Sequence, residues 1–297
     1  MRCISLILCL SLLCLPTGAM AGAPLWRSSV SSDITDLSIS ADGSRILAGG
    51  ERISLFSDSK TPLWQEWTAE LTAISADGSL IVGAEGTSLF LLNERGAVIS
   101  RYEMPSPSAV LALSADGKRI VVGDRFGKVH FYDANGDLRT TVDTDSGSKS
   151  GNIRSDIRDI VISSDGKCTA VITTCGLFFY KDAGKKAWAH DGITDGGVAV
   201  AVSGTGDVIV AGSDAGIRVL DGKGEDLWSQ KFRSPVTAVA ISKDGSCIIA
   251  GSRDDFVRCF DREGETVWES KTDGWIRDLA VSDDGSRILA GSMDKQV

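Results

Sequence analysis

Histidine is scarce in this chain of 297 residues, which contains only His130 and His190. Histidine is the commonest general base in enzymes and a frequent zinc ligand. Neither residue lies in a spacing typical of a catalytic triad or a zinc site. We therefore expect a protein that is not an enzyme and that carries no cofactor and no metal.

The chain also lacks an excess of basic residues, since 31 lysines and arginines face 40 aspartates and glutamates, a net charge of −9. Nucleic acids and anionic membranes attract basic surfaces, so neither is an expected partner. There is no N-x-S/T sequence either, and N-glycosylation is not expected.

Long apolar runs are confined to the start of the chain, where Arg2 precedes an apolar segment over residues 4–15. This segment is too short to cross a bilayer, and it ends before an A-x-A site at Ala21. We expect a signal peptide over residues 1–21 and a secreted, cell-surface or periplasmic protein with no transmembrane segment after cleavage. A lipoprotein anchored at Cys14 is the alternative, which Leu13 disfavours.

The seven cysteines divide between the predicted signal peptide and the mature chain, which keeps Cys168, Cys175, Cys247 and Cys259. Cys168 and Cys175 flank one predicted strand, which would hold their sulfurs about 15 Å apart, too far for a disulfide. Cys247 and Cys259 lie on the two arms of one predicted hairpin, where a pair is possible. Burial as small apolar side chains is the alternative.

A repeated S-x-D-G element organises the rest of the chain, with copies 35 to 49 residues apart. This period is the length of a four-stranded propeller blade. The turn positions of the seven copies are Asp42, Asp77, Asp116, Asp165, Thr205, Asp244 and Asp284. Apolar runs on both sides of Asp-Gly are typical of a β-hairpin. In residues 235–270 the pattern predicts four strands, a to d, over 235–242, 247–252, 256–261 and 265–270.

Tryptophan recurs on the predicted strand d, where we expect its ring to pack between adjacent blades. These tryptophans are Trp64, Trp188, Trp228 and Trp268, and Trp26 has the same context near the start of the chain. The last repeat stops after its second strand, so residues 24–30 are expected to complete it. We predict an all-β protein, with residues 22–297 forming one seven-bladed β-propeller of four-stranded antiparallel blades, closed by the N-terminal strand. Truncation of the last blade at the C-terminus is the alternative.

The segment from Asp261 to Trp268 reads D-x-x-G-x-x-x-W, and a near copy ends at Trp228. This segment is similar to the tryptophan-docking repeat of pyrroloquinoline-quinone-like propellers, whereas strands a and b look more like WD repeats. Residues 24–297 thus resemble exported propeller proteins of methanogenic archaea and bacteria. The resemblance implies the fold and says little about function. Quinone-dependent members place adjacent cysteines beside the cofactor, and Cys168 and Cys175 are not adjacent.

Three aspartates occupy one position of the predicted innermost strand, namely Asp36, Asp159 and Asp278. Arg158 and Arg277 precede two of them. A carboxylate there is costly unless it is paired or hydrated. One interpretation is a polar lining at a mouth of the central channel, and the other is a structural role, capping a backbone amide or pairing between blades.

The turns between strands b and c carry Arg125, Phe126, Arg253 and Asp254, and we expect a partner surface on this face. A long glycine- and serine-rich connection over residues 143–156 lies on the same side. The sequence therefore predicts a monomeric extracytoplasmic module that presents one propeller face to a protein, a peptide or a cell-surface polymer. The alternatives are a quinone- or metal-dependent enzyme and a scaffold for envelope assembly.

Overall fold

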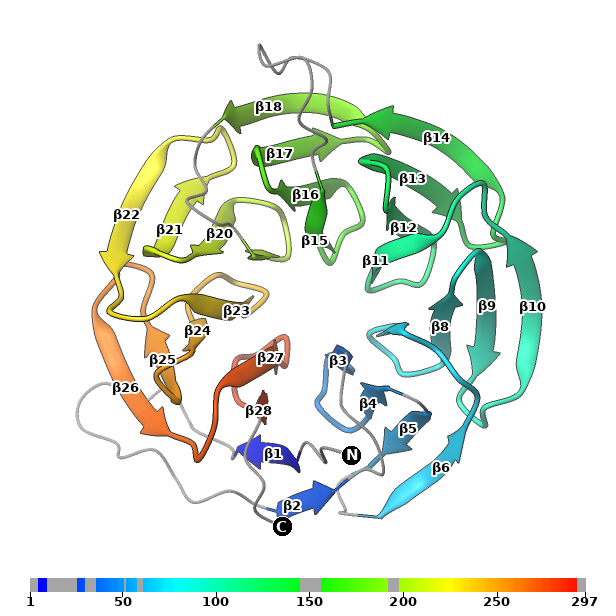
Figure 1. Ribbon diagram of the computed structural model, residues 1–297, viewed down its shortest axis with the longest axis horizontal. Helices are drawn as coiled ribbons and strands as arrows, with labels where there is room; N and C mark the ends of the chain where they lie inside the picture. The colour runs from blue at the N-terminus through cyan, green and yellow to red at the C-terminus, as the bar shows by residue number, and fades with distance from the viewer. Residues whose placement is uncertain are drawn as a thin grey trace.

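The structure is a computed structural model that describes residues 5–9, 26–29, 36–50, 52–57, 61–144, 156–191 and 198–292. For residues 5–9 and 26–29 the description covers the backbone alone. The described residues form β-strands and no helix, and their four-stranded sheets surround a common centre (Figure 1). The all-β propeller prediction is confirmed.

Six blades each consist of four consecutive antiparallel strands, with strand a at the centre and strand d at the rim. Blade 1 comprises β3 (Asp36–Ile39), β4 (Ile46–Gly49), β5 (Ile53–Phe56) and β6 (Pro62–Glu66), and blade 2 comprises β7 (Leu71–Ile74), β8 (Leu80–Glu85), β9 (Ser88–Asn93) and β10 (Val98–Glu103). Blade 3 comprises β11 (Ser108–Leu113), β12 (Arg119–Asp124), β13 (Lys128–Asp133) and β14 (Leu138–Asp143), and blade 4 comprises β15 (Ile157–Ile162), β16 (Cys168–Thr173), β17 (Gly176–Lys181) and β18 (Lys185–Asp191). Blade 5 comprises β19 (Ala199–Val202), β20 (Val208–Ser213), β21 (Gly216–Asp221) and β22 (Asp226–Lys231), and blade 6 comprises β23 (Val236–Ile241), β24 (Ile248–Ser252), β25 (Phe256–Phe260) and β26 (Thr266–Lys271).

The remaining sector holds a composite sheet, so the complete blades number one fewer than the seven predicted. Its strand order is β2-β1-β28-β27, in which β27 (Ile276–Val281) and β28 (Ile288–Ser292) come from the last repeat. The other two strands are β1 (Ser5–Cys9) and β2 (Trp26–Ser29). The expected N-terminal strand around Trp26 therefore lies at the rim but does not pair with β28, because β1 lies between them. The last repeat contributes only two described strands, and N-terminal strands occupy the other two positions.

The repeated S-x-D-G element closes the hairpin between strands a and b through its own side chains. In blade 1 the Ser40 hydroxyl donates to the Asp42 carboxylate at 2.7 Å and accepts the Arg45 N–H at 2.9 Å. The Ser44 N–H donates to the same carboxylate, and these hydrogen bonds lower the pKa of Asp42 to about 2. Gly43 takes a φ of 70°, which a side chain would strain. The element is therefore a structural turn.

Three of the docking tryptophans contact the turn between strands c and d of the following blade. Trp228 donates its ring N–H to the Arg262 carbonyl at 2.8 Å, and its ring lies against Gly264. Trp64 and Trp188 make the same kind of bond to the carbonyls of Glu94 and Gly222. Trp268 packs on the apolar cluster between blade 6 and the last repeat, whereas the side chain of Trp26 lies outside the described residues. These contacts join neighbouring blades.

Candidate functional site

The three inner aspartates each bond to the next blade around the ring. Asp278 accepts the Leu37 N–H at 2.7 Å, Asp36 accepts the Thr72 N–H at 2.8 Å, and Asp159 accepts the Val200 N–H at 2.8 Å. In every case the donor is the backbone N–H one repeat position further along strand a of the following blade. Asp159 and Asp278 also accept the N–H of the residue that follows them. Each carboxyl group thus links two adjacent inner strands.

Burial makes these carboxyl groups hard to ionise. It raises the pKa of Asp36 and of Asp159 to about 7, although the backbone hydrogen bonds act in the opposite direction. The pKa of Asp278 is also raised, by burial first and then by repulsion from Asp36. Asp36 further raises the pKa of Asp159, so the three groups interact across the centre of the ring. Near neutral pH the centre can therefore take up or release protons.

Arg158 and Arg277 are exposed beside Asp159 and Asp278, close to the ends of β15 and β27 where the strands enter from the d-to-a connections. In an antiparallel blade these connections and the turns between strands b and c lie on the same face. We call this side of the ring the b–c face. It therefore carries the two arginines near the centre and the four predicted turn residues further out.

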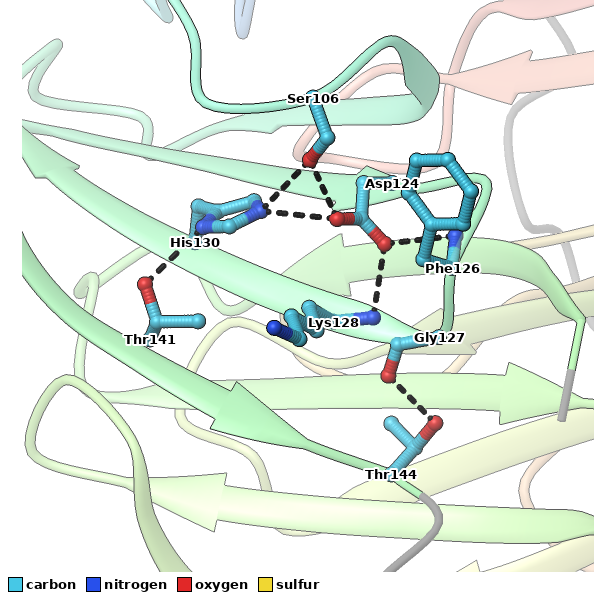
Figure 2. A network of polar contacts seen from close by, with 8 residues as sticks. All are labelled: Ser106, Asp124, Phe126, Gly127, Lys128, His130, Thr141 and Thr144. Atoms are coloured by element: carbon cyan, nitrogen blue, oxygen red, sulfur yellow. Dashed lines mark hydrogen bonds and ion pairs between the residues drawn. The ribbon is translucent and has the colours of Figure 1, made fainter. Parts of the chain in front are cut away.

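A buried polar network supports the b–c turn of blade 3 (Figure 2). Asp124 and His130 are 1% and 3% exposed, and His130 Nε2 lies 3.2 Å from Asp124 Oδ2. Ser106, from the preceding d-to-a connection, donates its hydroxyl to the same carboxylate oxygen. The other ring nitrogen, Nδ1, lies 3.0 Å from the Thr141 hydroxyl on strand d. The network therefore connects strands b, c and d with the neighbouring connection.

These residues do not form a hydrolytic triad. In such a triad the histidine bridges the acid and the nucleophile, with one ring nitrogen for each. Here Asp124 Oδ2 contacts both Ser106 Oγ and His130 Nε2, and the second histidine nitrogen is directed to Thr141 (Figure 2). Ser106 Oγ lies 3.4 Å from His130 Nε2, at the long end of a hydrogen bond. The arrangement is suited to holding a turn.

The buried polar network around Asp124 and His130 positions the exposed tip of the blade 3 b–c turn. Asp124 Oδ1 accepts the N–H groups of Phe126 and Lys128, both at 2.8 Å, and so fixes the backbone on either side of Gly127. Although burial opposes ionisation of Asp124, its hydrogen bonds, led by that from Ser106, hold its pKa below the ordinary value. Phe126 at the tip remains 46% exposed. A large apolar ring is thus presented to solvent on a rigid support.

Arg125 lies beside Phe126 and extends over the neighbouring blade. Its guanidinium lies 3.5 Å from the Glu70 carboxylate of blade 2 and 3.4 Å from the Ser108 carbonyl. Both charged side chains of this pair are about 60% exposed, so it contributes little to stability. The guanidinium therefore remains accessible to another anion.

Blade 6 builds its b–c turn on a similar plan, with an arginine in place of the histidine. Arg258 occupies the strand c position that His130 occupies in blade 3, because each pairs with the equivalent residue of strand b. Its guanidinium donates to Asp254 Oδ2 at 2.7 Å and to the Ser252 hydroxyl at 2.9 Å. The Arg258 guanidinium also lies over Phe256, 4.9 Å from the ring centroid. Asp254 thus serves as a turn support rather than as an exposed contact.

An exposed cation–π pair lies on the same side of blade 6. The Arg253 guanidinium is 5.5 Å from the centroid of the Trp275 ring, and Trp275 is 48% exposed. Trp275 belongs to the d-to-a connection before β27, and Arg253 belongs to the b–c turn. The pair combines a flat apolar ring with an exposed positive charge.

A pocket of about 280 Å³ opens between blades 5 and 6, and Asp254 of the blade 6 b–c turn belongs to its lining. Residues 230–233 from the end of β22 form one side, and Arg258 with Glu269 contributes to the other. Its polar lining suits a hydrophilic segment better than an apolar ligand.

The structure separates the sequence-predicted residues into three places. The aspartates lie between inner strands, Arg158 and Arg277 lie beside them, and Arg125, Phe126, Arg253 and Asp254 lie on two turns of blades 3 and 6. Sequence reasoning missed Ser106, Asp124, His130, Arg258 and Trp275. The signal for His130 and Arg258 was available, because each is a basic side chain in the middle of an otherwise apolar strand c.

Residues 172–296 match the model of a family of unknown function, DUF5711. No curated protein matches the chain. Within the described ranges, no group of three His, Cys, Asp or Glu side chains is arranged to hold a metal ion. The same residues include no helix that is long and apolar enough to span a membrane.

Proposed function

We propose that this protein is an extracytoplasmic binding or scaffold module that holds a protein, a peptide or a cell-surface polymer on the b–c face. The proposal rests on one observation: exposed aromatic rings lie next to arginines on this face, and buried polar groups support the b–c turns that carry those arginines. Aromatic and arginine side chains dominate the energetics of protein interfaces. A rigid support lowers the entropic cost of binding, because the turns are ordered before a partner arrives.

Export is part of this proposal, and it depends on the signal peptide expected over residues 1–21. In the structure residues 5–9 form β1, while the other residues of this segment lie outside the described part. Cleavage after Ala21 would remove β1 and leave β28 without its partner on that edge.

We also infer that the repeats are of the WD-like and pyrroloquinoline-quinone-like type. Support comes from Trp64, Trp188 and Trp228, each of which docks on the c-to-d turn of the following blade. This inference concerns the architecture and adds no cofactor.

The test is a set of three matched proteins used to recover partners from the envelope fraction of the native host. The face variant carries Phe126→Ala and Trp275→Ala, both on the b–c face. The control carries Lys118→Ala and Lys167→Ala on the a-to-b turns of the opposite face, where both lysine side chains are well exposed. The wild-type chain is the third protein.

We expect a partner that the wild-type and control proteins retain and that the face variant loses, with at least a tenfold weaker affinity when the purified pair is measured. Retention of that partner by the face variant, or its loss from the control, would show that another surface binds. A stoichiometric metal or chromophore in the purified protein would instead favour the enzyme alternative.

A further inference from the structure

Two cysteine sulfurs meet inside blade 6. Sγ of Cys247 lies 3.4 Å from Sγ of Cys259, and the two residues are 2% and 1% exposed. Cys259 on β25 pairs with Ile249, so Cys247 is its diagonal neighbour across the b and c strands. A disulfide bond is about 2.05 Å long. The sulfurs would therefore have to approach by about 1.4 Å to form the bond.

The repeat shows that this pairing belongs to blade 6 alone among the six complete blades. The strand b position of Cys247 is filled elsewhere by Arg45, Leu80, Arg119, Cys168 and Val208. The strand c position of Cys259 is filled elsewhere by Leu55, Leu91, Phe131, Phe179 and Val219. Blade 4 thus has the first cysteine but a phenylalanine in place of the second. Packing at these positions does not require cysteine, so the pair calls for another explanation.

We propose that Cys247 and Cys259 form a disulfide bond that links strands b and c of blade 6 when the protein meets an oxidising environment. The same hairpin carries the b–c turn with Arg253 and Asp254 and lies under the connection with Trp275. The bond therefore stabilises the hairpin that carries the blade 6 part of the b–c face. It does not depend on the proposed binding function.

The chemistry requires an oxidant of the disulfide class, such as oxidised glutathione. The Cys247 thiol loses its proton, and the thiolate attacks one sulfur of the oxidant and releases one thiol. The Cys259 thiolate then attacks the Cys247 sulfur of the mixed disulfide and releases the second thiol. One bond forms between the two protein sulfurs, the disulfide bond of the oxidant breaks, and two electrons and two protons pass from the protein thiols to the two released thiols.

Cys247 is suited to the first step. Its hydrogen bond with Cys259 lowers the pKa of its thiol, although burial acts in the opposite direction. By contrast, burial raises the pKa of the Cys168 thiol. Cys247 lies directly beneath the a-to-b turn of the last repeat, where Gly285 approaches its Cβ atom. An oxidant therefore reaches it during folding, or when that turn opens.

The test uses the full chain, refolded from denaturant in glutathione redox buffer and compared with a sample refolded in excess reductant. Remaining thiols are alkylated after unfolding, and the protein is digested with trypsin without reduction. We expect a linked pair of peptides over residues 244–253 and 259–262, with a mass two hydrogens below their sum. The oxidised sample should also unfold several degrees above the reduced one.

The Cys259→Ser variant supplies the control for the linkage, and Cys168→Ser supplies the matched control in blade 4. Cys259→Ser should lose both the linked peptide and the redox dependence of its unfolding temperature, whereas Cys168→Ser should keep both. Recovery of residues 244–253 and 259–262 only as separate alkylated or glutathionylated peptides would overturn the proposal. So would an unfolding temperature that still depends on redox conditions in Cys259→Ser.

Discussion

Asp159 combines two opposing effects in one side chain. Its carboxylate accepts two backbone N–H groups, which favour the charged form, yet burial has the larger effect and raises its pKa to about 7 from an ordinary 3.8. The folded protein therefore holds a proton between about pH 4 and pH 7 that the unfolded chain has already released. Its contribution to stability is present at low pH and is lost as the pH rises through about 7.

We predict that Asp159→Ala reduces the pH dependence of the free energy of unfolding between about pH 4 and pH 7, while Asp36 and Asp278 keep their share of it. A shift of this size corresponds to roughly 4 kcal/mol across the window. Alanine already stands at this repeat position as Ala199 and Ala238, so the variant should fold. Denaturant unfolding at a series of pH values tests this, with exposed Asp156→Ala as control. An unchanged slope in Asp159→Ala would contradict the assigned pKa.

His130 matters to the fold because its removal leaves a buried carboxylate with fewer partners. We predict that His130→Ala lowers the free energy of unfolding by about 2–3 kcal/mol, since it removes a partner of Asp124 and creates a cavity. Thr141→Val removes only the hydrogen bond at the other ring nitrogen and should cost less than about 1 kcal/mol. Urea denaturation gives both values. Equal losses in the two variants would contradict the prediction that the contact between His130 and Asp124 stabilises the fold more than the contact between His130 and Thr141.

The junction between blades depends on close approach of a tryptophan ring to a glycine. At Gly264 an added Cβ would lie 2.7 Å from the Trp228 ring, with a φ of 91°. At Gly86 the φ is 57°, and an added Cβ would meet nothing within 4 Å. Alanine substitutions at the two glycines therefore distinguish the cost of backbone strain from the cost of disturbed packing between blades.

We predict that Gly264→Ala lowers the free energy of unfolding by about 2–4 kcal/mol, because the ring must move and its hydrogen bond to Arg262 is strained. Gly86→Ala should cost only about 1 kcal/mol, the conformational penalty. Tryptophan fluorescence during denaturation measures both. Similar losses in the two variants would mean that ring packing adds nothing to the junction.

Whether the composite sheet keeps its strand β1 depends on whether the protein is exported and its signal peptide removed. If the signal peptide is cleaved as expected, the chain recovered from outside the cytoplasm should begin at Gly22 and lack β1. N-terminal sequencing of that material tests the prediction directly. An intact N-terminus at Met1 would instead favour the sheet in which β1 separates β2 from β28.

The blade pattern was readable from the chain because it is local. The S-x-D-G turns, the apolar strands that follow them and the tryptophans depend on contacts within about 40 residues, and these recur at a fixed period. Strand boundaries in blade 6 agree within one or two residues, as for β24 (Ile248–Ser252) against the predicted 247–252. Such agreement is expected where each turn requires particular side chains.

The closure of the ring and the roles of the buried polar groups required the tertiary structure. Asp278 bonds to Leu37, 241 residues away, and no local pattern specifies that partner. Likewise, the insertion of β1 depends on which edge strand lacks a neighbour once the ring has formed. Sequence periodicity determines which residues form a blade, whereas contacts between distant segments determine how blades join and which buried carboxyl groups interact. The reason is physical: a hairpin places residues that are close in the sequence next to each other, whereas ring closure places the first and last repeats side by side.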